Sequence, residues 1–129
     1  KSANMMSRVS LADRETAHKT VGECEGRLRS ARSFLLESCR QVDECIARGQ
    51  DIPNDVAAVQ RCAAANASLA AADVTIAMFR LAGSTSFYAT SRLDRCFRDV
   101  NTLTQHAVGG LAGATVAGRY WMGGPLTPI

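Results

Sequence analysis

The sequence predicts an all-α fold, namely an up-and-down four-helix bundle with one long N-terminal helix. The first observation is a regular recurrence of apolar residues at three- and four-residue steps, which is typical of a helix packed along its neighbours. The second is the abundance of alanine, the residue of highest helix propensity, in the middle of the chain. The third is that only 5% of the 129 residues are aromatic, which argues against a β-sandwich.

The length allows one domain, or one large fragment of a longer protein. We expect an extended lead-in over residues 1–12, the helical bundle over 13–124 and a loose C-terminal tail over 125–129. The sequence begins with Lys1 rather than Met, and we expect it to be the C-terminal part of a longer chain.

The first helix is predicted to begin after an N-cap at Asp13 and to end at Gly49. Gly22 and Gly26 lie inside it and each costs roughly 1 kcal/mol of helix propensity relative to alanine. Close approach of another helix would account for both glycines. The apolar seam that defines the helix comprises Val21, Cys24, Leu28, Ala31, Leu35, Ser38, Val42 and Cys45.

The second helix is predicted over 56–81, after a short connection and a cap at Asn54 or Asp55. Its centre, residues 62–72, consists almost entirely of small side chains, and charges nearly vanish there. Small residues let neighbouring backbones approach closely, so we expect this helix to be the central and most buried one. Gly83 is predicted to end it.

Two shorter helices complete the predicted bundle. The third covers about 92–103, and Gly109-Gly110 separates it from the fourth, which covers about 111–122. Gly123-Gly124-Pro125 is predicted to terminate the last helix.

Several classes of function are disfavoured by composition. Fifteen Lys and Arg residues stand against twelve Asp and Glu, and the two signs interleave, so nucleic acid is not an expected partner. No uninterrupted apolar run approaches about 18 residues, so no membrane span is expected. The first residues contain no apolar signal-peptide core, and we expect a cytoplasmic protein.

A metal site is not expected either. Five cysteines without a two-residue spacing fit small, buried hydrophobic residues better than a zinc site: Cys24, Cys39, Cys45, Cys62 and Cys96. His18 and His106 lie far apart, with no acidic or cysteine neighbour at the spacing that metal ligands require.

The charged third helix allows two interpretations. Arg95 and Arg98 lie on neighbouring positions of one helical face, close to Asp94 and Asp99. These residues could form ion pairs that stabilise the bundle. Alternatively, an arginine could hold a phosphate in a bidentate manner, with further donors from the hydroxyl-rich turn 84–86.

His106 follows this helix and precedes a double glycine. A histidine at a helix end is most often a structural, hydrogen-bonded residue, and a catalytic role is the alternative. The glycines at 109–113 do not have the spacing of a dinucleotide-binding fingerprint, and no predicted strand precedes them.

Taken together, three segments resemble the C-terminal helical domain of the acyl-CoA dehydrogenase superfamily, over roughly 11–124. More narrowly, they resemble its flavin-dependent monooxygenase branch, which includes the oxygenase components of hydroxyphenylacetate hydroxylases and dibenzothiophene monooxygenase. The combination of Arg-x-x-Arg-Asp with a histidine eight residues after the second arginine is the most specific feature. The segments are Asp73–Ser84, Leu93–Val100 and Thr104–His106.

The resemblance implies a bundle that builds a homo-oligomer, expected to be a tetramer arranged as a dimer of dimers, and that contacts FAD or FMN. Arg80, Gly83 and Ser84 match the place where one subunit reaches toward its neighbour's flavin, and Arg98 completes the predicted cofactor-binding set. In the dehydrogenases this place usually carries a glutamine and a Gly-Gly pair, from which Arg80 and Ser84 depart.

His106 matches the histidine that lies beside the flavin ring in the monooxygenases, which makes it the predicted catalytic residue. An imidazole can donate or accept a proton near neutral pH. Many dehydrogenases place a catalytic glutamate directly after the position of His106, where this sequence has Ala107. Alanine cannot abstract a proton, so the resemblance favours a monooxygenase.

We therefore predict the C-terminal domain of a flavin-dependent monooxygenase that hydroxylates an aromatic or apolar substrate, with flavin reduced by a separate reductase. The isolated domain is expected to be inactive. One alternative is a fragment of an acyl-CoA dehydrogenase whose catalytic base lies in another domain. The other alternative is a free-standing four-helix interaction module without a cofactor.

Overall fold

The computed structural model describes residues 10–106 and 111–127, and within them the chain is helical without any strand. The predicted all-α fold with a long N-terminal helix is confirmed. Its elements are the 3₁₀ segment η1 (Leu11–Asp13), the helices α1 (Glu15–Ala47) and α2 (Asn54–Ala82), the 3₁₀ segment η2 (Gly83–Phe87), and the helices α3 (Arg92–Thr104) and α4 (Leu111–Trp121).

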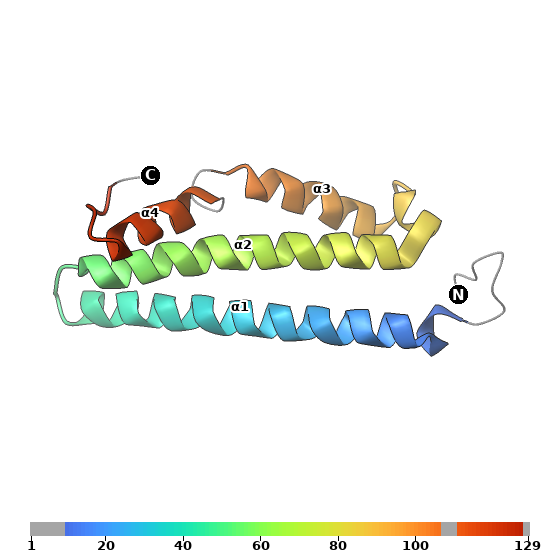
Figure 1. The fold of residues 1–129 in the computed structure, drawn as a ribbon, viewed down its shortest axis with the longest axis horizontal. Coiled ribbons are helices and arrows are strands. Elements are labelled where there is room, and N and C mark those ends of the chain that lie inside the picture. The colour runs from blue at the N-terminus through green and yellow to red at the C-terminus, as the bar shows by residue number, and fades with distance from the viewer. Residues whose placement is uncertain (1–9, 107–110, 128–129) are drawn as a thin grey trace.

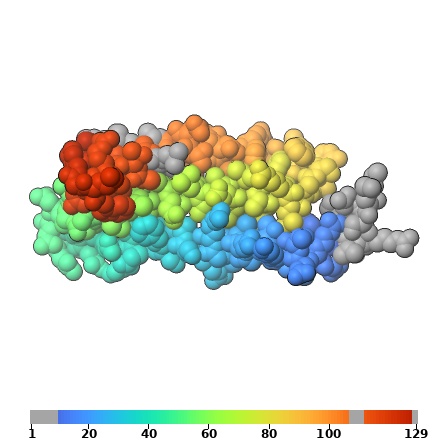
Figure 2. Space-filling view, viewed as in Figure 1, coloured from blue at the N-terminus to red at the C-terminus, as the bar shows by residue number. Residues whose placement is uncertain are grey.

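The helices are arranged in three layers, with α2 in the middle (Figure 1). The long helices α1 and α2 run antiparallel over the length of the molecule, while α3 and α4 follow one another along the opposite side of α2. Figure 2 shows the elongated shape that results. Because α3 and α4 pack on α2 rather than on α1, no described helix covers the outer surface of α1.

The predicted central position of α2 is confirmed by its burial on two sides. Small side chains allow this, and Gly113 of α4 is one residue that comes close to the backbone of α2. A Cβ atom added at Gly113 would lie 2.8 Å from the backbone oxygen of Arg61. The buried residues of α2 are Ala58, Ala63, Ala65, Ser68, Ala70, Ala72 and Val74.

The segment Asn54–Phe87, 34 residues long, has a length and apolar composition that would suffice to cross a membrane, the only such helix among the described residues. This qualifies the sequence expectation, which considered only uninterrupted apolar runs. The core helix of a globular bundle satisfies the same criterion, and the other three helices pack on α2. We therefore assign α2 to the core of the bundle.

Both predicted helix-ending glycines are confirmed by their backbone conformation. Gly49 has φ 66° and Gly83 has φ 64°, a left-handed conformation that side-chain-bearing residues rarely adopt. The N-terminal caps were predicted wrongly. Asp13 lies in η1 and Arg14 precedes α1, while Pro53 precedes α2, and neither of these two positions caps its helix through a side chain.

The prediction that another helix approaches Gly22 and Gly26 is not met within the described chain. A Cβ atom built at either glycine would meet no atom within 4 Å, because both residues face away from α2. The cysteines are also less buried than predicted, since four of them are half-buried and Cys96 is exposed. All five are free thiols.

Candidate functional site

A pocket of about 540 Å³ lies where the end of α2, the η2 segment and α3 meet. It gathers three of the four residues that the sequence predicts to bind the cofactor, which are Arg80, Gly83 and Ser84. The remaining lining residues are apolar: Ile76, Phe79, Phe87 and Phe97.

Three phenyl rings form the apolar part of this pocket. Phe79 makes an edge-to-face contact with Phe87, with ring centroids 5.0 Å apart, and a tilted contact with Phe97 at 4.6 Å. Such ring pairs stabilise beyond the area that they bury. Phe87 is nevertheless 70% exposed, so one ring of the cluster remains accessible to a ligand.

Sequence reasoning did not name Phe79, Phe87 or Phe97 as site residues. A signal was present, because three of the four phenylalanines of the sequence fall between positions 79 and 97, among the predicted cofactor residues. Helix spacing alone did not reveal that α2 and α3 bring Phe79 and Phe97 together.

Gly83 directly follows α2 and is exposed. Its N–H donates to the backbone oxygen of Arg80, and a Cβ atom added here would meet nothing within 4 Å. The left-handed conformation of Gly83 disfavours any other residue although there is space for one. A ligand can therefore approach the main chain closely at this point.

The three hydroxyl groups of the turn have different roles. Thr85 Oγ1 donates to the backbone oxygen of Ala82 at 2.8 Å, and Ser86 Oγ donates to that of Gly83 at 2.6 Å. These two bonds satisfy carbonyl groups at the end of α2. Ser84 is exposed and its hydroxyl bonds to no described residue, so it alone of the three can donate to a ligand in the pocket.

Arg80 is exposed and makes no side-chain hydrogen bond or ion pair with any described residue. Most arginines of α1 behave differently. Arg27 pairs with Asp73 of α2 at 2.7 Å, and Arg29 pairs with Glu25 at the same distance. The charge of Arg80 is thus available to a ligand.

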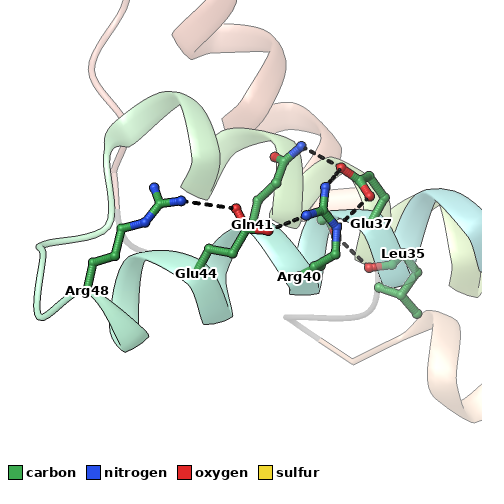
Figure 3. A network of polar contacts seen from close by, with 7 residues as sticks. Leu35, Glu37, Arg40, Gln41, Glu44 and Arg48 are labelled. Carbon is green, nitrogen blue, oxygen red and sulfur yellow. Dashed lines mark hydrogen bonds and ion pairs between the residues drawn. The ribbon is translucent and has the colours of Figure 1, made fainter.

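Figure 3 shows the densest network of charged side chains along α1. Arg40 donates to Glu37 at 2.7 and 3.0 Å, and it also donates to Glu44. Gln41 donates to Glu37 as well, and Arg48 lies 3.8 Å from Glu44. The hydrogen bonds from Arg40 lower the pKa of the Glu37 carboxyl below its ordinary range. These charges are satisfied within α1.

Two of the three arginines of α3 also have partners. Arg98 pairs with Asp94 at 3.0 Å and Arg95 with Asp99 at 3.6 Å, both across one helical turn. The ion-pair interpretation therefore describes their arrangement in this chain. Arg98 does not line the pocket, although its neighbour Phe97 does.

His106 lies just beyond the opposite end of α3. Its backbone N–H donates to the oxygen of Leu103 at 3.0 Å, and the residue is exposed. The 13 residues of α3 span about 20 Å, so the helix separates His106 from the pocket that contains Arg80. Ala107 and the glycines at 109–110 fall outside the described residues.

No metal site emerges from the described residues, because they contain no group of three or more histidine, cysteine, aspartate or glutamate side chains that could hold an ion. The chemistry that the arrangement offers is therefore that of an aromatic pocket with one available cation, and of an exposed imidazole at the far end of α3.

Comparison with known proteins shows to which family the chain is related. The family model described as "Acyl-CoA dehydrogenase, C-terminal domain" matches residues 1–109. Indole-3-acetate monooxygenase from Pseudomonas putida is 37% identical over 113 residues, which cover 88% of this chain and 29% of that relative. The chain thus spans less than a third of the relative's length. No solved structure matches the chain.

Proposed function

Because the chain belongs to the acyl-CoA dehydrogenase family, we propose that it is the C-terminal, flavin-contacting domain of a flavin-dependent monooxygenase that hydroxylates an aromatic or similarly apolar substrate. The observation that carries this proposal is the 37% identity to a monooxygenase over 88% of the chain. The name of that relative also favours an aromatic substrate.

The pocket residues fit a flavin nucleotide. Arg80 offers an unpaired guanidinium group, Ser84 an available hydroxyl, and Gly83 a backbone that a ligand can approach closely. Guanidinium groups bind phosphate through two parallel hydrogen bonds. We infer that these three residues contact the flavin nucleotide of a neighbouring subunit. Arg98 would join them only if it exchanged its bond with Asp94 for one to the nucleotide.

His106 is the candidate catalytic residue. The reduced flavin, when bound, would supply the electrons with which oxygen is activated. An exposed imidazole after α3 can hold or transfer a proton at a ring nitrogen and can position a substrate by hydrogen bonding.

We further propose that the domain assembles as a homo-oligomer, most simply a tetramer. Support comes from the outer surface of α1, where Gly22 and Gly26 are open and none of the described helices covers them. Several large apolar side chains of the same helix are also exposed: Val21, Leu28, Leu36 and Ile46. Apolar side chains exposed along one helix would be covered if this helix packed against another subunit.

Two further proposals concern the setting of the enzyme. We place it in the cytoplasm, and we propose that a separate reductase supplies the reduced flavin. The isolated 129 residues are expected neither to bind flavin tightly nor to turn over, because a domain that spans 29% of its relative contributes only part of a flavin pocket. Tight binding by this domain alone, measured by quenching of flavin fluorescence, would contradict that expectation.

The test of the proposed function uses the full-length protein with chemically reduced flavin, oxygen and a panel of aromatic acids and phenols. We expect a product whose mass has increased by one oxygen atom, with incorporation of label from ¹⁸O₂. Flavin oxidation that yields only hydrogen peroxide across the whole panel, with no hydroxylated product, would count against the proposal.

One observation favours a second function. The matching family model is that of acyl-CoA dehydrogenases, so a dehydrogenase with its base in another domain is the alternative. Anaerobic bleaching of the oxidised flavin of the full-length protein by an acyl-CoA would support it. A flavin that stays oxidised under these conditions would reject it.

A further inference from the structure

The chain turns back after α4, and its last described residues contact both α4 and α2 (Figure 1). We propose that residues 123–127 form a strap that fastens α4 onto α2, and that release of this strap lets α4 open while the other helices stay folded. The anchors are Arg61 of α2 and Arg119 of α4, which both donate to Thr127. This conformational device goes beyond the proposed function and does not depend on it.

Two guanidinium groups from different helices converge on Thr127. Arg61 Nη1 donates to the backbone oxygen of Thr127 at 2.6 Å, and Arg119 Nη1 donates to its Oγ1 at 3.2 Å. Neither arginine forms an ion pair with a carboxylate among the described residues. Arg61 is half-buried, and a guanidinium group withdrawn from water is costly without a hydrogen-bond acceptor. The charge of Arg61 therefore favours the docked position of the strap.

The turn after α4 directs the strap toward these anchors. Gly123 has φ 90°, a conformation that favours glycine, and its N–H donates to the backbone oxygen of Tyr120 at 3.0 Å. The N–H of Gly124 donates to the backbone oxygen of Arg119 at 3.0 Å. A Cβ atom added at Gly124 would lie 2.7 Å from Cγ of Arg119, so the strap runs directly against this side chain. The two glycines thus bring Thr127 within reach of both guanidinium groups.

The helix α4 needs such fastening because its own stability is low. It is 11 residues long, and isolated helices of this length are marginal in water. Gly113 and Gly118 lower its helix propensity further. Among its described residues, the buried side chains are those of Val116 and Ala117. Of the described helices, α2 is the one on which α4 packs extensively, so contacts with α2 decide whether α4 stays in place.

Arg61 contacts α4 near its start as well as beyond its end. The backbone oxygen of Arg61 faces Gly113, where an added Cβ atom would lie 2.8 Å away, and its side chain reaches Thr127. One residue of α2 therefore meets both ends of the segment that the strap closes. The strap also bears on the candidate site. Only four residues separate His106 from Leu111, so α4 anchors the chain that continues after His106.

Hydrogen exchange of the full-length protein, followed by mass spectrometry, measures the opening of α4 and requires neither flavin nor substrate. Arg61→Met removes every donor of the side chain but keeps an unbranched stem. We expect the amides of α4 to exchange about 10-fold faster, as for loss of a hydrogen bond from a charged donor, and those of α1 to change by less than about 2-fold. Thr127→Val removes only the hydroxyl group, whose bond to Arg119 is exposed, and should accelerate the exchange of α4 by less than about 3-fold.

Two further variants separate the strap from general effects. Arg32→Met removes an exposed arginine of α1 that has no partner among the described residues, and it should leave the exchange of α4 unchanged. Replacement of residues 125–129 by a flexible glycine–serine segment removes the strap and leaves Arg61 in place. It should accelerate the exchange of α4 as much as Arg61→Met does. Addition of Arg61→Met to this variant should then change the rate by less than about 2-fold, because both changes remove the same contact.

Faster exchange that is confined to α4 would support the strap. Unchanged exchange of α4, both in Arg61→Met and in the variant with the flexible tail, would overturn it. Equal acceleration in α1 and α4 would also overturn it, because Arg61 would then stabilise the whole bundle rather than fasten α4. Additive effects of the two changes would contradict it as well, because Arg61 would then act independently of the tail.

Discussion

The two layers that pack on α2 differ in what their surfaces offer. On the α1 side, the network around Arg40 is satisfied by Glu37 and Glu44, and none of the predicted site residues lies on this helix (Figure 3). On the side of α3 and α4, the aromatic pocket contains the unpaired Arg80, and His106 follows α3. Both layers are rich in charge, so charge density does not mark the site.

This difference shows that the site is marked by an arginine without a carboxylate partner, and not by the number of charges nearby. A guanidinium group that already donates to carboxylates within its own helix has little left for a ligand, and exposed pairs of this kind add little stability. An arginine without a counter-ion beside an apolar cavity is available for binding. We therefore propose that ligand binding and catalysis take place on the α3 side of α2, and that α1 contributes to stability and to subunit assembly.

Substitution of the two histidines tests this assignment, and His106→Ala is expected to have the largest effect of the changes considered. His106→Ala in the full-length protein should lower the rate of hydroxylation about 100-fold and increase peroxide release, because removal of a general acid or base typically costs 10²- to 10⁴-fold. His18→Ala on α1 is the matched control, since His18 Nε2 lies 2.6 Å from the backbone oxygen of Ala12 and has no proposed catalytic role. Equal losses in both variants would remove His106 from the mechanism.

Two glycines test the packing of the layers. Gly113→Ala should destabilise the 129-residue chain by about 1–3 kcal/mol, because the new Cβ atom would lie 2.8 Å from the backbone oxygen of Arg61. Gly22→Ala on α1 meets no atom and should stabilise the chain by roughly 0.5–1 kcal/mol through helix propensity. Urea denaturation followed by circular dichroism measures both changes.

Gly22→Ala also tests the proposed assembly. If another subunit packs against this part of α1, the added methyl group should weaken the oligomer of the full-length protein although it stabilises the isolated domain. Analytical ultracentrifugation would show a shift toward smaller species. An oligomer of unchanged size and affinity would place the interface elsewhere.

Two arginines compare ion pairs in the two layers. Arg98→Ala on α3 should destabilise the chain by less than about 1 kcal/mol, because this side chain is exposed. Arg40→Ala on α1 should likewise change the stability only slightly, because its side chain is exposed as well. The partner of Arg98, the side chain of Asp94, is 21% accessible to solvent. A loss above about 2 kcal/mol for Arg98→Ala alone would show that its pair is less exposed than described.

The smallest effect concerns the titration of Glu37. Hydrogen bonds from Arg40 lower the pKa of its carboxyl, so this pair contributes to stability above the pKa of the unfolded state, and the contribution is lost as the pH falls through the lower pKa of the folded state. Arg40→Ala should raise the pKa of Glu37 toward its ordinary value. NMR titration of the side-chain carboxyl carbon measures this shift, and an unchanged midpoint would show that Arg40 does not hold the carboxylate in solution.

Much of the fold could be predicted from the sequence because it depends on local chemistry. Gly49 and Gly83 end their helices since they alone adopt the left-handed conformation at low cost, and the run of small residues places α2 at the centre. The cap at Asp13 was wrong because η1 adds a 3₁₀ turn that moves the start of α1 beyond it. Local preference alone cannot anticipate such a turn.

The candidate site was predictable only in part. The resemblance identified Arg80, Gly83 and Ser84, and the structure brings these three together. Two features were not predicted. Phe79 and Phe97 line the same pocket, and the hydroxyl groups of Thr85 and Ser86 donate to backbone carbonyls. The first of these facts depends on how α3 folds back on α2, and the second on the 3₁₀ conformation of η2, which the sequence did not predict.

The central claim is that the full-length protein uses its flavin to hydroxylate rather than to dehydrogenate. The most direct measurement is oxygen consumption against product formation, with reduced flavin and an aromatic substrate such as indole-3-acetate, the compound named in its monooxygenase relative. For the best substrate of the panel, we predict one molecule of hydroxylated product for each molecule of oxygen consumed. We also predict that an acyl-CoA does not bleach the flavin. Rapid anaerobic bleaching by an acyl-CoA, with no hydroxylated product from any aromatic compound, would contradict the account.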